Sequence, residues 1–355
     1  MVKPPAFRRG WIAAALVAVA AMAITPVAFA DHAKDQGGQS KSCDISDKLV
    51  NSCRPWLGAR ANGYPGIGDD EIKQLDDHAK RIDHHLDIVH TYAPAGKLPL
   101  SSEQDKDLAR RDDTYLFQNW KPVDDWSKAG GKDAEVNKHI DDAADNIKSV
   151  APKKLFLTIH HEAENDVSSD GDCATNGDGK AGTAAEYRDM WKNVRQRFDA
   201  KGVDNVVWVM DYMNYPKWDC LVPKLYPGDD LVDWIMFNGY GDGKHADFDD
   251  NVGRFYSLLT KLSNADRDLT SKPWGIGEWS IHDSTQAQAR AYYEQAAKAV
   301  ADNTFDNLKA YVIFDSPGPE AASGLRIRYD DSGDADSKEE QDYKAFANNP
   351  VFDEG

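Results

Sequence analysis

The stretch LFLTIH at residues 155–160 is an almost continuous apolar run, and EYRDMWKNVRQRF at residues 186–198 follows it with a helical period. One stripe of the second stretch carries large apolar side chains: Tyr187, Met190, Trp191, Val194 and Phe198. A run that is apolar throughout is typical of a parallel strand covered on both faces. The two stretches therefore predict a strand followed by a helix, with the aromatic stripe packed against the sheet.

The same alternation continues along most of the chain. Strands are expected at residues 54–58, 86–90, 115–119, 155–160, 206–210, 232–238, 274–278 and 310–314. Helical periods lie between them, for example at residues 71–81, 135–150, 184–200, 250–262 and 285–301. Eight such units in about 300 residues match a (β/α)8 barrel. The alternative, a doubly wound sheet, needs a glycine-rich turn that residues 58–68 lack, so we predict an α/β, single-domain TIM barrel.

The N-terminal segment predicts export. Lys3, Arg8 and Arg9 precede an apolar run at residues 11–25, and Ala28-Phe29-Ala30 has the small residues of a cleavage site. We interpret residues 1–30 as a signal peptide, residues 31–42 as a flexible leader and residues 43–355 as the barrel. The alternative is a membrane anchor, for which the run is short. The expected product is secreted and extracellular, with no membrane contact after cleavage.

Charge restricts the partners of the chain. Its 355 residues include 42 Lys and Arg against 60 Asp and Glu, a net charge of -18, and 41% are hydrophobic. The hydrophobic fraction supports a large core and excludes global disorder. The acidic excess argues against nucleic acid, anionic membranes and polyanionic substrates, because these partners require basic side chains. We expect a neutral or cationic partner, and a monomer by default.

The four cysteines are expected to form disulfides. Their number is even, the predicted route is oxidising, and no Cys-x-x-Cys occurs. Of the three possible pairings we favour Cys43–Cys53 as a local clip and Cys173–Cys220 as a bridge between two loops.

Two glutamates lie at the carboxyl ends of strongly apolar strands, which is where the active sites of such barrels are found. Glu162 comes after the strand at 155–160, and Glu278 ends the strand at 274–278. One such carboxyl can protonate a leaving oxygen while the other attacks a sugar carbon. The alternative is that both glutamates cap helices or pair with surface Lys and Arg. Glu164 is a second-ranked candidate, because alternation places it on the same side as Glu162.

Other chemistries find less support in the sequence. A His-Glu-x-x-His zinc motif fails, because Asn165 occupies the position of the second histidine. His160 and His161 face opposite sides of a strand, so we expect His160 to be packed or hydrogen bonded. The Asp-rich loop at residues 170–178 is either an acidic turn or a calcium loop of irregular register. No metal and no cofactor are expected.

From about Cys53 to Phe352 the chain resembles glycoside hydrolase family 26, a group best known for β-mannanases. The resemblance is carried by TIHHEAEND, GVDNVVWVMDY, YPGDDLVDWIMFNGY, KPWGIGEWS and KAYVIFDS followed by GLRIRYD. It implies a (β/α)8 barrel, in agreement with the strand count.

The resemblance also implies roles for individual residues. Glu162 matches the acid/base glutamate, and Glu278 in GIGEW matches the nucleophile. His161 matches a histidine that orients the acid/base or contacts the sugar, and Tyr240 matches a tyrosine whose hydroxyl lies near the nucleophile. Phe314 stands where a tryptophan commonly forms the floor of the sugar site.

Two further positions depart from the family pattern, Lys121 and Asn238, both of which are commonly acidic. Tryptophans at or beyond strand ends could stack on sugar rings. We favour Trp120 and Trp279 over Trp126 and Trp218 because they lie close to the motif strands.

These observations predict a secreted retaining endo-β-glycanase that cleaves a polysaccharide, with β-1,4-mannan as the leading substrate. The alternatives are a β-glucanase or β-xylanase of the same family, or a non-catalytic glycan-binding barrel.

Overall fold

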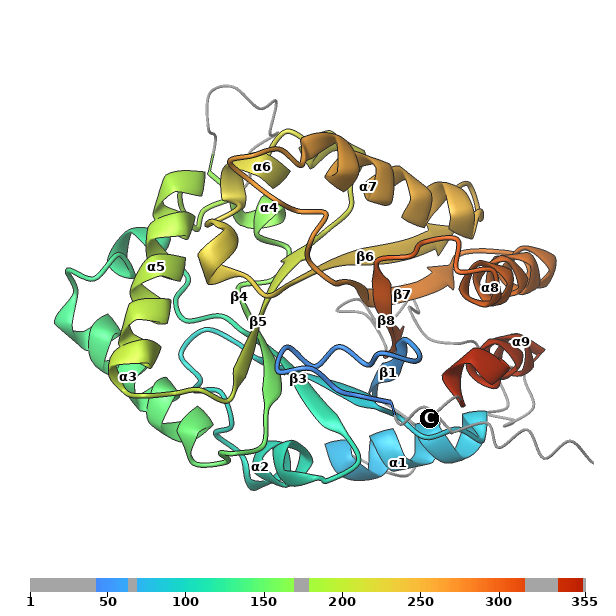
Figure 1. The fold of residues 1–355 in the computed structure, drawn as a ribbon, viewed down its shortest axis with the longest axis horizontal. Helices are drawn as coiled ribbons and strands as arrows, with labels where there is room; N and C mark the ends of the chain where they lie inside the picture. The colour runs from blue at the N-terminus through green and yellow to red at the C-terminus, as the bar shows by residue number, and fades with distance from the viewer. Residues whose placement is uncertain (1–42, 63–68, 169–178, 317–337, 354–355) are drawn as a thin grey trace, which may run out of the picture. The chain divides into compact units, whose positions relative to one another are not determined.

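A closed barrel of eight parallel strands organises the computed structural model, which describes residues 43–62, 69–168, 179–316 and 338–353. The strands follow one another around the barrel in chain order, and β8 pairs with β1 (Figure 1). Their bounds are β1 Trp56–Ala61, β2 Ile88–Ala93, β3 Tyr115–Trp120, β4 Leu155–Ile159, β5 Val206–Tyr212, β6 Trp234–Asp242, β7 Trp274–His282 and β8 Leu308–Asp315.

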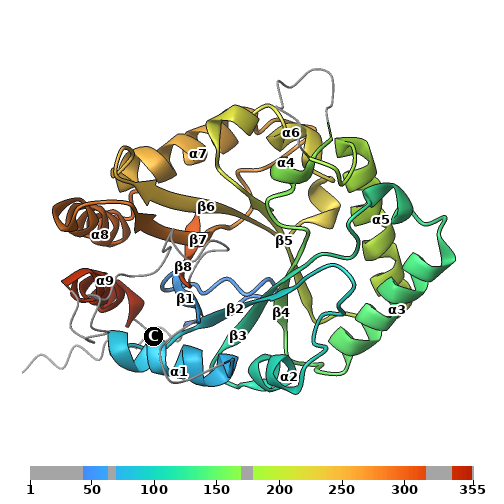
Figure 2. The ribbon, with the colours of Figure 1, turned by 180° about the vertical axis from the view of Figure 1, so that it is seen from behind.

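Helices surround the barrel on its outside, as Figures 1 and 2 show from opposite sides. The α-helices are α1 Glu71–Ile82, α2 Glu103–Arg110, α3 Ala134–Lys148, α4 Ala163–Asp166, α5 Ala184–Ala200, α6 Val222–Leu225, α7 Phe248–Leu262, α8 Gln286–Ala301 and α9 Lys338–Ala347. Short 3-10 helices are η1 Trp126–Lys128, η2 Pro216–Trp218, η3 Asp229–Leu231 and η4 Pro350–Phe352.

The predicted (β/α)8 barrel is confirmed. Each predicted strand overlaps an observed one, and the helix expected at residues 184–200 is α5. The observed strands extend further toward the carboxyl end than predicted at β2, β6 and β7. These extensions matter because the carboxyl ends of the strands carry the candidate site.

The barrel interior is a packed apolar core near the amino ends of the strands. The rings of Phe156 in β4 and Trp234 in β6 lie 5.3 Å apart although β5 separates these strands, which places both side chains inside. Phe117, Val209 and Met236 belong to the same buried cluster. A filled interior leaves the space above it, at the carboxyl ends of the strands, for a functional site.

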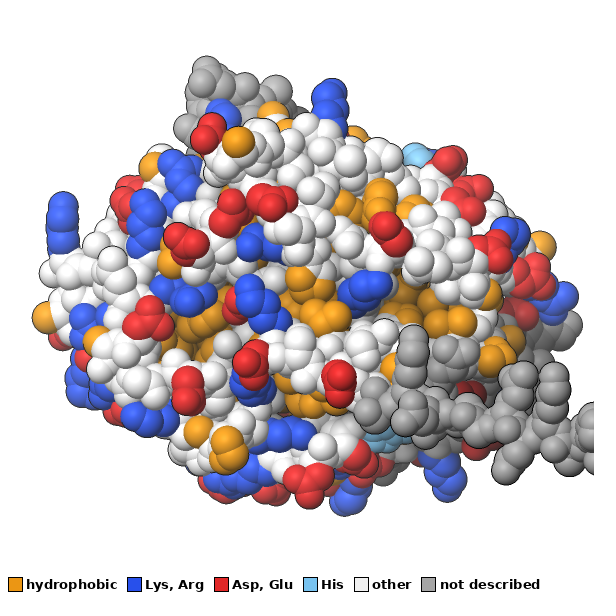
Figure 3. Space-filling view, in the orientation of Figure 1, with side chains coloured by type: hydrophobic (Ala, Val, Ile, Leu, Met, Phe, Trp, Pro, Cys, Tyr) orange, Lys and Arg blue, Asp and Glu red, His pale blue; other side chains and the backbone are white. Residues whose placement is uncertain are grey.

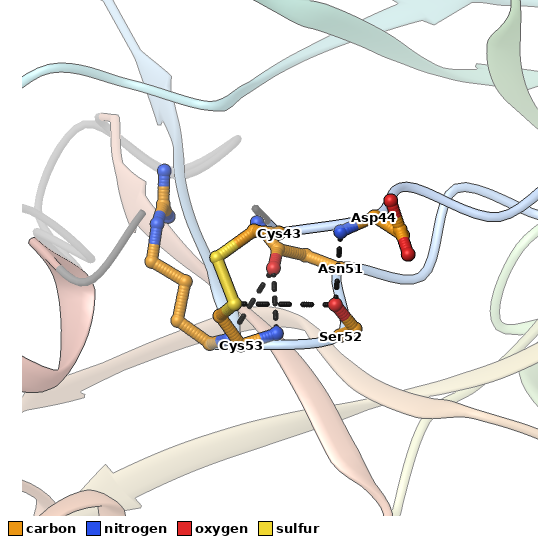
Figure 4. The surroundings of a disulfide bond; sticks show 6 residues. Cys43, Asp44, Asn51, Ser52 and Cys53 are labelled. Atoms are coloured by element: carbon orange, nitrogen blue, oxygen red, sulfur yellow. Dashed lines mark hydrogen bonds between the residues drawn. A yellow bond between two sulfur atoms is a disulfide. The ribbon is translucent and has the colours of Figure 1, made fainter. Parts of the chain in front are cut away.

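The segment before β1 closes the opposite end of the barrel. The indole N–H groups of Trp56 and Trp234 each donate 2.6 Å hydrogen bonds to this segment, at the carbonyls of Leu49 and Lys48. A disulfide between Cys43 and Cys53 clips the segment, with the Cα atoms 5.5 Å apart (Figure 4). The predicted Cys43–Cys53 pairing is therefore confirmed. Cys173 lies outside the described residues, so its pairing with Cys220 stays a prediction.

The surface drawn in Figure 3 mixes charges of both signs. Basic side chains there are separated by acidic ones, and hydrophobic side chains gather near the middle of the face. Among the described residues on this face, the arrangement gives a polyanion no continuous basic surface.

The predicted signal peptide and leader, residues 1–42, lie outside the described residues, as does the Asp-rich loop at 170–178. Within the part of the chain that the structure describes, none of the helices has the length and apolarity needed to cross a bilayer.

Candidate active site

The turn after β4 positions Glu162 over the barrel. The backbone N–H of Glu162 donates to the carbonyl of Asp211 in β5, at 3.1 Å. His160 and Glu162 both have left-handed backbone conformations, with φ of 53° and 52°. Such values are uncommon for residues other than glycine, and they turn the chain sharply between β4 and α4. The Glu162 side chain is consequently aimed by the turn and by β5 together.

Glu278 reaches the same place from β7. Its pairing partner in β6 is Asn238, at a point where the register of the two strands shifts. The Asn238 amide donates a 2.6 Å hydrogen bond to the Glu162 carboxyl. Asn238 therefore lies between the two glutamates, as strand neighbour of one and hydrogen-bond donor to the other. An aspartate at position 238 has no N–H to donate, so the asparagine fits this contact.

Two tyrosines hold the Glu278 carboxylate. Tyr240 donates to one oxygen at 2.7 Å, and Tyr92 donates to the other at 2.5 Å. The ring nitrogen Nε2 of His161 lies 3.8 Å from the oxygen that Tyr92 contacts. Hydroxyl donors to both oxygens fix the orientation of the group. His161 therefore lies beside the Glu278 carboxyl.

Glu162 differs from Glu278 in its electrostatic surroundings. Burial, followed by the negative charge of Glu278, raises the pKa of Glu162 to about 8, and the Asn238 hydrogen bond acts in the opposite direction. At neutral pH the group therefore keeps its proton. One group of the pair is thus a neutral acid, and the other is held by hydroxyl donors. This difference in surroundings suits Glu162 to donate a proton and Glu278 to act as a nucleophile.

Comparison with known proteins identifies the family of the chain. The model of glycosyl hydrolase family 26 matches residues 111–310, which is more than half of the chain. The chain belongs to glycosyl hydrolase family 26. It is accordingly a glycoside hydrolase by family membership. No curated protein matches it in a sequence comparison.

Solved structures of family 26 enzymes share the fold at low sequence identity. A catalytic domain of an endo-β-1,4-mannanase from Bacillus sp. JAMB-750 is 14% identical with a TM-score of 0.59, over 82% of this chain and 85% of that one. A β-mannanase from Bacteroides ovatus is also 14% identical with a TM-score of 0.59, over 84% and 90%. For a ruminal endo-β-1,4-mannanase the values are 14% and 0.55, and the match spans 83% of this chain but only 63% of that enzyme's length.

Within this family 26 barrel, a hydrogen-bonded network supports the turn that carries Glu162. The indole N–H of Trp126 donates to His160 Nδ1 at 2.9 Å, and His160 Nε2 lies 2.6 Å from Asp166. Lys121 contacts the same Asp166 oxygen at 3.0 Å. Burial lowers the pKa of His160 to about 4, so its ring is neutral at pH 7. The expectation of a hydrogen-bonded His160 is confirmed, and Lys121 is used in this network.

Glu164, the second-ranked candidate, is turned away into the fold. One of its carboxyl oxygens accepts the backbone N–H of Met213 at 3.0 Å, and only 2% of the residue is exposed. Burial raises the pKa of Glu164 to about 7. The short helix α4 thus directs Glu164 toward the loop after β5, which gives it a structural contact.

The tryptophans favoured for sugar stacking lie in the core, which corrects that expectation. Trp120 and Trp279 are both fully buried. Trp279 follows the inward-facing Glu278 along the strand, so it points outward and packs against Phe346 of α9, at 4.8 Å between ring centroids. Trp120 packs against Phe198 of α5. Phe314 is partly exposed and lies 6.1 Å from the Tyr240 ring, at the site.

Two residues of the site were absent from the sequence predictions, Tyr92 and Asp211. Tyr92 was missed because the strand was predicted to end at residue 90, whereas β2 continues to Ala93. Asp211 is fully buried in β5, and neither carboxyl oxygen has a hydrogen-bond partner among the described residues. A Cβ at Gly277 would lie 3.0 Å from both oxygens, so Asp211 packs against the backbone just before Glu278. Side chains two residues apart in a strand share a face, so the inward position of Val209 also predicts an inward Asp211.

Replacing Tyr92 by phenylalanine should lower kcat/KM about 10- to 100-fold, because a hydrogen bond to a charged group contributes about 1.5–3 kcal/mol. Steady-state kinetics on a polysaccharide that the enzyme cleaves measures the effect. Tyr256→Phe is the matched control, since the Tyr256 hydroxyl also donates to a carboxylate, Asp306, on the outside of the barrel. Equal losses in the two variants would contradict a role for Tyr92 in holding Glu278.

Asp211→Asn should stabilise the protein above acidic pH. Burial, followed by the charge of Glu278, raises the pKa of Asp211 well above its usual value. The unfolded chain loses this proton near pH 4 and the folded chain keeps it, so the wild type loses stability as pH rises from there. The gain of the variant should grow by up to about 1.4 kcal/mol per pH unit, measured by urea unfolding at several pH values.

The control for this stability measurement is Asp142→Asn, because the Asp142 carboxyl pairs with Lys138 on the surface. Loss of that pair should leave stability unchanged or slightly lower, with no gain toward higher pH. If Asp211→Asn were destabilising at every pH, the carboxyl would be ionised and paired in the folded protein, against the structure.

Proposed function

We propose that this chain is a secreted, retaining endo-β-glycanase that acts on β-1,4-mannan. The observation that carries the proposal is the convergence of two glutamates on Asn238: Glu162, which accepts its amide N–H, and its strand neighbour Glu278, which two tyrosine hydroxyls hold. Retaining glycosidases require such a pair, one group as acid and one as nucleophile.

The reaction would proceed in two displacements. Glu162 gives its proton to the glycosidic oxygen while a Glu278 oxygen bonds to the anomeric carbon, and the carbon–oxygen bond to the leaving sugar breaks. The product of this step is a glycosyl ester on Glu278 and a carboxylate on Glu162. Glu162 then takes a proton from water, whose oxygen attacks the anomeric carbon, and Glu278 leaves as a carboxylate. Both groups end in their starting protonation states.

The choice of mannan rests on the structural relatives, several of which are named as β-mannanases. The acidic composition supports a neutral polysaccharide over a charged one. Export is proposed from residues 1–30, whose charged start, apolar run and small residues have the pattern of a signal peptide.

Product analysis on a polysaccharide panel tests the proposal. Purified protein is incubated with β-1,4-mannan, mixed-linkage β-glucan and β-1,3-xylan, and new reducing ends are measured. We expect cleavage of mannan into mixed oligosaccharides, with the β-anomer formed first in proton NMR. Release of the α-anomer first would contradict the retaining mechanism. Cleavage of glucan or xylan alone would indicate a β-glucanase or β-xylanase of the same family. Binding without cleavage would support a non-catalytic glycan-binding barrel.

A further inference from the structure

A pocket of about 550 Å³ lies between the loop after β5 and the loop after β6. Tyr240, whose hydroxyl holds Glu278, forms part of its lining. Tyr240 thus borders both the pocket and the Glu278 carboxyl, which places the pocket beside the candidate active site, and its volume is within the range of sites for small ligands.

Tyr215 lines this pocket and is unusually open to solvent. Its residue surface is 51% exposed, and among the described residues only one other large hydrophobic side chain, that of Ile45, is similarly open to solvent. The Tyr215 ring packs edge to face with the Trp218 ring, at 5.2 Å between centroids. The backbone carbonyl of Tyr215 accepts the backbone N–H of Trp218 at 2.9 Å, which anchors Tyr215 at the start of η2. A supported aromatic ring that faces solvent in a pocket is suited to stack on a ligand.

The wall of the pocket is joined to the backbone of Tyr240 by hydrogen bonds. Asn214 donates to the carbonyl of Asn251 at 3.2 Å, and Asn251 donates to the carbonyl of Tyr240 at 2.7 Å. Arg254 reaches Asn214 and also forms an ion pair with Asp219 at 2.7 Å. The wall thus has a fixed shape before any ligand arrives, which lowers the entropic cost of binding.

We propose that this pocket binds a neutral sugar unit of the polysaccharide, stacked on Tyr215 and close to the bond that is cleaved. The C–H face of a pyranose suits the phenol ring, and its hydroxyl groups suit the polar side chains around it. The lining mixes Lys and Asp side chains, and its Arg254 is already paired with Asp219, which favours a unit without net charge. The inference rests on the proposed function, because it assigns part of the same polysaccharide to this pocket.

The test is Tyr215→Ala, assayed on β-1,4-manno-oligosaccharides of increasing length. Loss of the stacking face should raise KM about 3- to 10-fold for oligosaccharides long enough to fill the pocket. The effect on kcat should be small, because Tyr215 does not contact the catalytic glutamates. Tyr215→Phe keeps the ring and should restore most of the lost affinity.

Ile45→Ala is the control, since it removes an exposed hydrophobic side chain from the segment before β1. An unchanged KM in Tyr215→Ala, or the same rise in Ile45→Ala, would overturn the sugar site. A wild type that cleaves no manno-oligosaccharide would instead overturn the mannan assignment, so the two failures are distinguishable.

Discussion

Glu278→Ala is expected to abolish turnover, with a loss in kcat on the order of 10⁴-fold or more, because the proposed displacement loses its nucleophile. The variant cannot form the glycosyl ester, and neither Tyr92 nor Tyr240 can replace the carboxylate, since burial raises the pKa of both phenols well above 10. Reducing-end assays on mannan measure the loss. Trapping of the ester in wild type with a slow fluorinated substrate, followed by mass spectrometry, should locate the label on Glu278.

The fold should survive this substitution, which separates chemistry from stability. Glu278 is surrounded by hydroxyl donors, and its removal leaves Tyr92 and Tyr240 able to bind water in its place. Thermal unfolding of Glu278→Ala and of the isosteric Glu278→Gln should therefore remain cooperative. Glu103→Ala serves as the control, because Glu103 is an exposed residue of α2 that pairs with Lys106. Full activity in Glu278→Ala would refute the assignment of the nucleophile.

The barrel could be predicted because each strand is a short apolar run and each large helix has a clear apolar stripe. The helix at 184–200 was predicted at its observed bounds, since its stripe is long and it begins at a Thr183 capping box. The short helices α4 and α6 have too few residues to show a period, so nothing in the sequence separated them from loops.

The site was predicted only as far as individual strand ends could be placed. Glu162 and Glu278 follow apolar runs, and a carboxylate there is conspicuous. Trp279 was misassigned because its nearness to Glu278 along the chain says nothing of the face that it occupies. Alternation puts it on the opposite face of β7, under α9. The hydrogen bond from Asn238 to Glu162 depends on the register shift between β6 and β7, which no residue pattern revealed.

Glu162→Gln is expected to lower kcat/KM on mannan about 10²- to 10⁴-fold, the usual contribution of general acid–base catalysis. The amide keeps the shape of the side chain but has no acidic proton for the glycosidic oxygen. An aryl mannoside with a strongly acidic leaving group needs little protonation, so its first step should be nearly unaffected. A variant equally slow on both substrates would contradict the role of acid.

The pH profile gives an independent test of the same residue. The proposed mechanism needs Glu162 protonated to start the reaction, so kcat/KM should fall as the pH rises through its raised pKa, about 8. Removing the Glu278 charge should lower the pKa of Glu162, because that charge is the second cause of the shift, after burial. Carbon-13 NMR of labelled glutamate in wild type and in Glu278→Gln can follow this titration directly. If Glu162 titrated near the ordinary glutamate pKa in wild type, the buried neutral acid, and with it the separation of roles between the two glutamates, would be wrong.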